Sequence, residues 1–184
     1  MSHFEFIMIM LSIIVGLGVS ILLTNVARQI KAGTNCKPYW VQSIITLTIF
    51  IGLLQQWWES WDLQVVDSWT FPIVLVMLAG PIGLFILSHL LFPEELDGAD
   101  LQQHYFMASK GIWGIAMMVV IASTLFRPLA FAYTLIDWDN AASIGLLFVF
   151  GVLFLSNNKS VHQLLVPLLF TAVVSDILIF NSTI

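Results

Sequence analysis

Long runs of apolar residues alternate with short polar gaps along the entire chain. Six runs stand out, at residues 4–27, 39–60, 71–92, 106–127, 141–156 and 161–180. An α-helix needs about 20 apolar residues to cross a hydrocarbon layer about 30 Å thick. The pattern therefore predicts an all-α, polytopic integral membrane protein, in which a bundle of six transmembrane helices forms a single transmembrane domain over residues 1–184.

Composition supports the same class. Hydrophobic residues make up 59% of the 184 residues and charged residues only 9%, with a mean hydropathy of +0.97. Soluble domains carry about 25% charged residues. Six spans and their connections use nearly the whole chain, so no separate catalytic domain is expected. Residues 1–6 lack the basic region of a cleaved signal peptide, so we expect the first helix to be retained.

The basic residues predict how the helices are oriented. Positively charged flanks remain on the cytoplasmic side during membrane insertion. Five of the six basic residues lie beside the first, third and fifth gaps, namely Arg28, Lys31, Lys37, Lys110 and Lys159. We therefore expect these gaps in the cytoplasm and both termini on the extracytoplasmic side. The compactness of the chain favours a bacterial inner membrane as its location.

Two further counts exclude other classes of function. Cys36 is the only cysteine, so an internal disulfide and a cysteine metal site are both excluded. The net charge is -5 and the few cations are spread along the chain, which argues against a nucleic-acid partner. Membrane lipids are the expected surroundings, and no cofactor is expected.

A row of small side chains marks one face of the first predicted helix. Ser12, Gly16, Ser20 and Thr24 recur every four residues, so they line up on one side of a helix. Such a row lets a second backbone approach closely in a membrane. It predicts a helix-packing seam, used either within the bundle or between copies in a homo-oligomer.

Proline interrupts two of the predicted helices. Gly80 and Pro81 lie near the centre of the third run, and Pro167 lies in the sixth. Proline removes a backbone donor and clashes with the preceding turn, so it frees carbonyls for other partners. Broken helices at matching places in two inverted three-helix halves point to transporter binding sites. Ordinary kinks in packed membrane helices explain the same residues without any repeat.

Charged residues gather near the predicted extracytoplasmic ends of three runs. A charge inside a span costs about 2.5–3.5 kcal/mol on insertion scales and usually faces protein or water. Glu59 ends the second run, Arg127 ends the fourth, and Asp176 lies near the end of the sixth. Gln55 precedes Glu59 by four residues and shares its helix face. We expect Arg127 to pair with Asp176, Glu59 or both, either at the mouth of a transport pathway or as an ion pair that only fixes helix packing.

Three histidines, His89, His104 and His162, lie toward the cytoplasmic ends of predicted helices. Neutral imidazole binds metals and haem iron, so residue type alone makes them metal candidates. They form no His-x-x-x-His pair and no cysteine or deep carboxylate accompanies them, so we favour interfacial side chains and expect no metal site. Motifs of hydrolases, zinc proteases and phosphate-binding enzymes are absent from the sequence, and we expect no enzyme activity.

Two functions remain open at this point. The leading hypothesis is a channel or transporter for a cation, a proton or a small polar solute, with the charged cluster at its outer mouth. The alternative is a non-transporting sensor or accessory subunit that docks on a partner membrane protein. A water-filled route to the carboxylates favours the first function, and a dry, closed interior favours the second.

Overall fold

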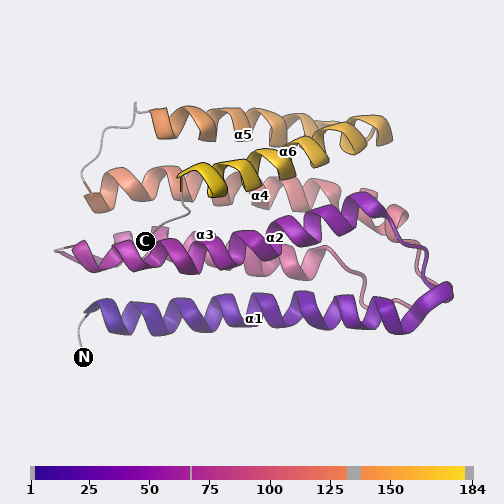
Figure 1. Ribbon diagram of the computed structural model, residues 1–184, viewed down its shortest axis with the longest axis horizontal. Helices are drawn as coiled ribbons and strands as arrows, with labels where there is room; N and C mark the ends of the chain where they lie inside the picture. The colour runs from indigo at the N-terminus through magenta and orange to yellow at the C-terminus, as the bar shows by residue number, and fades with distance from the viewer. Residues whose placement is uncertain (1–2, 67, 132–137, 181–184) are drawn as a thin grey trace.

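The chain folds into six α-helices that run back and forth along one axis (Figure 1). This computed structural model describes residues 3–66, 68–131 and 138–180. The helices are α1 (His3–Ala32), α2 (Trp40–Glu59), α3 (Phe71–Leu90), α4 (Leu101–Phe131), α5 (Trp138–Leu155) and α6 (Lys159–Phe180), and two short 3₁₀ helices, η1 (Gly33–Asn35) and η2 (Ser60–Val65), follow α1 and α2. No strand occurs in these three ranges, so the predicted all-α class is confirmed, and each predicted apolar run overlaps one helix.

Four of the described helical segments are long and apolar enough to cross a membrane. They cover His3–Asn35, Phe71–Leu90, Leu101–Ala130 and Lys159–Leu178. α5 offers a shorter apolar stretch, Ala142–Leu155, and α2 has 20 residues, of which three are glutamine. The structure is thus a bundle of mainly apolar helices, while six spans with assigned sides stay a prediction.

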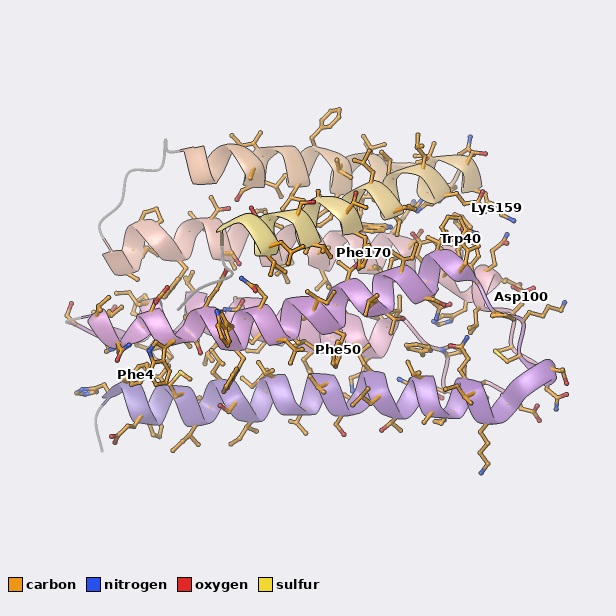
Figure 2. The ribbon with its side chains drawn as sticks, in the orientation of Figure 1. Phe4, Trp40, Phe50, Asp100, Lys159 and Phe170 are labelled. Atoms are coloured by element: carbon orange, nitrogen blue, oxygen red, sulfur yellow. The ribbon has the colours of Figure 1, made fainter. Side chains whose placement is uncertain are left out.

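The connections define the two ends of the bundle. Figure 2 places Phe4 near one end and Asp100 and Lys159 near the other. We call the end where α1 begins, and toward which α6 runs, the terminal end. The opposite end, with the α1–α2, α3–α4 and α5–α6 connections, is the loop end (Figure 1).

The helices form two layers. α3 packs between α1 and α4, and α4 packs on α5, whereas α2 packs on α1 and α6. In Figure 1, α2 and α6 lie in front of α3 and α4. Contacts of α2 with α3 and α4 join the layers. Within the described residues no Cα atom of α6 lies within 8 Å of one of α4, so side chains fill the space between these two helices.

Glycines bring neighbouring helices together at their crossings. A Cβ atom on Gly83 of α3 would lie 2.3 Å from Val119 Cγ2 of α4, closer than real contacts allow. On Gly18 of α1 the same atom would lie 3.1 Å from two methyl carbons of Leu53 in α2. Small residues permit such short separations where lipid gives helices no hydrophobic reason to associate. Glycine therefore allows the close approach of α1 to α2 and of α3 to α4.

The row Ser12, Gly16, Ser20 and Thr24 faces away from the other helices. All four residues are exposed, and a Cβ atom on Gly16 would meet nothing within 4 Å. The buried residues of α1 lie on its other side, at Ile7, Leu11, Val15, Gly18, Leu22 and Asn25. The seam therefore makes no helix contact within the described part of the chain, which was one of its two predicted uses. Contact between copies stays a prediction.

Local signals fix where two helices begin. Asp100 Oδ1 accepts hydrogen bonds from the backbone N–H groups of Gln102 and Gln103, both at 3.1 Å, and so caps α4. Asn158 Oδ1 accepts the N–H of Ser160 at 3.0 Å at the start of α6. These side-chain caps set the first turns of α4 and α6.

Backbone and side-chain hydrogen bonds join the connections at the loop end. The N–H of Lys37 donates to the Ala99 carbonyl at 2.9 Å, which links the α1–α2 and α3–α4 connections. Arg28 of α1 donates to the Glu94 carbonyl in the same α3–α4 connection. The Lys37–Asp100 ion pair, at 3.8 Å, is exposed and contributes little. Hydrogen bonds thus fix this end more than charge does.

Candidate functional site

A polar cavity lies at the terminal end between α2, η2, α3 and α4. Its volume is about 140 Å³, which is room for several water molecules. Its polar lining includes Gln56, Glu59, Ser60 and Asp62 from α2 and η2 and Ser123 from α4. We call this space the terminal cavity. Two carboxylates and an amide on one side thus meet a hydroxyl group on the other.

Glu59 is positioned by its own helix. Gln55 lies four residues earlier, and its Nε2 donates to Glu59 Oε1 at 2.8 Å. Ser60 Oγ donates to the Trp57 carbonyl at 2.5 Å, so its hydroxyl hydrogen is taken up by the backbone. Residues three and four apart meet on a helix surface. The Gln55 bond therefore orients the Glu59 carboxylate where α2 passes into η2.

Gly80 belongs to another wall of the cavity, and Pro81 follows it within α3, which continues as one α-helix from Phe71 to Leu90. Both residues are buried inside α3. A Cβ atom on Gly80 would lie 3.1 Å from Gln56 Oε1 and 3.9 Å from Ser123 Oγ, so a glycine here lets these side chains approach the α3 backbone. Pro81 has no N–H, so the carbonyl of Met77, four residues earlier, loses its helical donor. Met77 lines the cavity, so a backbone carbonyl without its helical donor belongs to a lining residue.

The predicted charged cluster is only partly assembled around this cavity. Glu59 lines it, and Gln55 bonds Glu59. Asp176 has an exposed side chain on α6, and no described residue of α6 lines the cavity. Arg127 belongs to α4, but its side chain lies outside the described residues. Pro167 lies within α6, away from the cavity lining. The pairing of Arg127 therefore stays a prediction.

The three histidines have separate surroundings. His89 is exposed and meets the Phe85 ring edge-on. His104 Nε2 lies 3.1 Å from the Leu90 carbonyl. His162 is 0% exposed, so it faces the protein interior rather than the interfacial surroundings expected for it. In the part of the chain that the structure describes, no group of three or more His, Cys, Asp or Glu residues is placed to hold a metal ion.

A second polar site, built around His162 near the loop end, was not predicted from the sequence. His162 Nδ1 lies 2.6 Å from Tyr105 Oη, and Trp113 Nε1 donates to the same oxygen at 3.1 Å. Tyr105 and Trp113 are 0% and 2% exposed. We call these three residues the loop-end network. Tyr105 and Trp113 lie eight positions apart on α4, which is about two helical turns and was the one signal available in the sequence.

Comparison with protein-family models, with curated proteins and with solved structures gives no match for this chain. The two polar sites are the features of the described residues that bear on function. The terminal cavity combines carboxylates, an amide and a hydroxyl around a space of water size, which suits a proton, a cation or a hydrogen-bonding solute. The loop-end network combines imidazole, phenol and indole groups, which suits proton exchange.

Proposed function

We propose that this protein is a membrane channel or transporter that moves a cation, a proton or a small polar solute. The observation that carries the proposal is the terminal cavity, which reaches Gly80, the tenth of the 20 residues of α3. A polar space therefore extends about halfway along an otherwise apolar helix. Ionisable groups inside a membrane bundle usually mark substrate or ion pathways, because they are costly to keep there.

The proposal places the bundle in a cell membrane, with all six helices crossing it and the loop end in the cytoplasm. Basic residues support this side, because four of them lie on the loop-end connections or within a helix turn of them: Arg28, Lys31, Lys37 and Lys159. Lys110 lies in the third turn of α4, counted from the same end. Basic flanks stay in the cytoplasm, so the terminal cavity faces outward, toward the periplasm in a bacterium. A membrane-impermeant amine reagent should label Lys31 and Lys159 from the same side, and labelling from opposite sides contradicts the topology.

Flux into liposomes tests the transport function. The purified protein is reconstituted, and entry of protons, Na⁺, K⁺ and a small neutral polar solute is followed. Glu59→Gln removes a charge from the cavity with little change in shape, so it should reduce flux several-fold while the protein stays folded. The control is Asp176→Asn, which also removes one carboxylate charge, but from an exposed position on α6 outside the cavity lining.

The two variants give distinct outcomes. Flux that falls in Glu59→Gln and stays at the parent rate in Asp176→Asn supports a route through the terminal cavity. Equal effects of the two substitutions contradict that route. A parent protein that moves none of the four probes contradicts the transport function itself.

A homo-oligomer through the exposed seam of α1 belongs to the same proposal. Small residues at Gly16 and Ser20 offer a second copy a close approach. Ser20→Cys should therefore form a disulfide-linked dimer under mild oxidation in membranes. Leu168→Cys, on the exposed face of α6, is the control, because Leu168 is 57% exposed but lies outside the seam. Equal cross-linking of both variants contradicts a specific α1 interface.

A non-transporting accessory role is the competing function. The exposed rings of Trp57, Trp58 and Trp61 near the terminal end, 48%, 41% and 53% exposed, give a partner protein an aromatic surface. Such rings equally suit the headgroup layer of a membrane. Purification in a native detergent followed by mass spectrometry decides between the accessory role and the transport function. A stoichiometric membrane partner together with absent flux supports the accessory role, and isolated protein that moves a solute contradicts it.

A further inference from the structure

The hydrogens of the loop-end network can be assigned from their partners. His162 Nε2 lies 2.8 Å from the Ser156 carbonyl oxygen, which only accepts, so Nε2 carries the hydrogen of the neutral ring. Nδ1 is then the acceptor, and Tyr105 Oη donates to it at 2.6 Å. Trp113 Nε1–H donates to Tyr105 Oη at 3.1 Å. Donors thus follow one another in a single direction, from Trp113 to Ser156.

The two ring nitrogens of His162 face different surroundings. Nδ1 faces the bundle interior, where Tyr105 is 0% exposed. Nε2 faces the α5–α6 turn, where Asn157 and Asn158 next to Ser156 are exposed. A histidine in such a place can take up a proton at one nitrogen and release a proton from the other. The ring therefore connects the interior with the loop-end surface.

Two further buried polar atoms lie on the α2 side of the network. Tyr39 packs against Tyr105, with ring centroids 5.5 Å apart, and Gln42 follows three residues after Tyr39. Tyr39 Oη and Gln42 Oε1 have no hydrogen-bond partner among the described residues, although Tyr39 and Gln42 are only 3% and 1% exposed. Buried polar atoms that lack a protein partner are usually bonded to internal water. These atoms therefore mark a place for internal water beside the tyrosine pair.

We propose that the loop-end network is a proton relay and that the species this protein moves is the proton. The inference rests on the proposed transport function and narrows its substrate. A metal cation needs a shell of oxygen ligands around it. The network instead consists of phenol, imidazole and indole groups whose polar atoms are already bonded to one another. It can pass hydrogen along its bonds without making room for an ion.

The transfer balances with one proton and no electrons. The Tyr105 Oη–H bond breaks as His162 Nδ1 gains that proton, and the Nε2 proton leaves to water at the α5–α6 turn. Phenol is a far weaker acid than imidazolium, so Tyr105 Oη gains a proton as it gives one up. That proton arrives on internal water as hydronium, and its transfer to Tyr105 leaves a neutral water molecule. A turn of the imidazole ring then restores the resting tautomer. One proton has moved from the bundle interior to the loop-end surface.

Proton flux in proteoliposomes tests the relay, with a pH-sensitive dye inside and a potassium diffusion potential as the driving force. Tyr105→Phe keeps the ring and removes the donor, and His162→Gln keeps a polar side chain without an exchangeable ring nitrogen. Each should lower proton flux by about tenfold or more, as expected when a positioned proton-transfer group is lost. His89→Gln is the control, because it makes the same substitution at an exposed histidine of α3 that lies outside the network.

The outcomes distinguish the relay, the choice of the proton and the transport function from one another. Loss of proton flux in Tyr105→Phe and His162→Gln, but not in His89→Gln, supports the relay. Parent-like proton flux in folded Tyr105→Phe overturns the relay and leaves the transport function standing. If the parent moves Na⁺, K⁺ or the neutral solute but no protons, the proton assignment and the relay are overturned, and the transport function stands. Absence of every flux in the parent refutes the transport function. Nitrogen-15 NMR of the parent, which needs no variant, overturns the relay if His162 carries its hydrogen on Nδ1.

Discussion

Replacing Gly83 by alanine should separate α3 from α4 at their tightest crossing. The new methyl carbon would lie 2.3 Å from Val119 Cγ2, whereas carbon atoms prefer separations of about 3.5–4.0 Å. The helices must therefore move apart by about 1 Å, or Val119 must leave its rotamer. Overpacking of this kind costs about 1–3 kcal/mol, and the better helix propensity of alanine offsets up to about 1 kcal/mol of it. We expect a net loss of about 1–2 kcal/mol in the free energy of unfolding.

Thermal unfolding of the detergent-solubilised protein measures this loss. A loss of 1–2 kcal/mol lowers the Tm of a chain of this size by about 3–6 °C. Gly145→Ala in α5 is the matched control, because its new methyl meets nothing within 4 Å and lies outside the α1 seam, so its Tm should not fall. Val119→Ala should rescue Gly83→Ala, since the Val119 Cβ atom lies at an ordinary 3.7 Å from the new carbon. The double variant should thus be more stable than additivity of the single changes predicts.

Two results would refute the reasoning. If Gly83→Ala and Gly145→Ala have the same Tm, the α3–α4 crossing is looser than the distance to Val119 indicates. If Val119→Ala fails to rescue Gly83→Ala, the cost arises elsewhere than at this contact. Either result would also weaken the terminal cavity as a defined space, because α3 and α4 form two of its walls.

Gly80→Ala should reduce flux, because the new methyl lies 3.1 Å from Gln56 Oε1 in the cavity lining. The protein should stay folded, because Gln56 Oε1 is at the end of a flexible side chain that can shift. Parent-like flux at an unchanged Tm contradicts this prediction. The pKa of the Cys36 thiol is raised, first by burial and then by a nearby carboxylate charge. The thiolate is the reactive form, so maleimide should modify Cys36 more slowly than the exposed cysteine introduced by Thr34→Cys. The rate at Cys36 should also continue to rise at pH values where the rate at position 34 has levelled off. Mass spectrometry over time measures the two rates, and equal rates contradict the expectation. Tyr39→Phe should lower stability by about 1 kcal/mol if internal water bonds the hydroxyl, and a Tm at or above that of the parent would mean that this oxygen has no partner.

The helices were predictable because their signals are local. Runs of apolar residues set the positions of all six helices within a few residues, and Asp100 caps α4 as its side chain suggests. The α1 and α4 helices extend beyond the predicted runs, to Ala32 and Phe131. Polar residues do not end a helix whose backbone bonds continue. Apolar pattern therefore marks the part of a helix suited to lipid, and hydrogen bonding marks its ends.

The terminal cavity was predictable only in part. Glu59 ends α2 at the terminal end, and Gly80 lies at the middle of α3, as their positions in the apolar runs indicate. These positions could not indicate which helices are neighbours, and α6 packs on α2 and α5 rather than on the α3–α4 side of the cavity. For this reason Asp176 lies outside the lining although it has a suitable depth. Neighbour relations depend on packing between distant residues, which one sequence does not encode in any short motif.

The middle of the bundle decides what kind of transport the two polar sites permit. Ser123 of the terminal cavity follows Trp113 of the loop-end network by ten positions, which is a rise of about 15 Å along α4. The nine residues between them, 114–122, are all Gly, Ala, Ile, Met or Val. A permanently open pore would need polar side chains or water at this depth, because bare backbone and charge are costly there. This apolar stretch of α4 between the two polar sites instead favours a protein that exposes one site at a time, so that the transport we propose would require the helices to move.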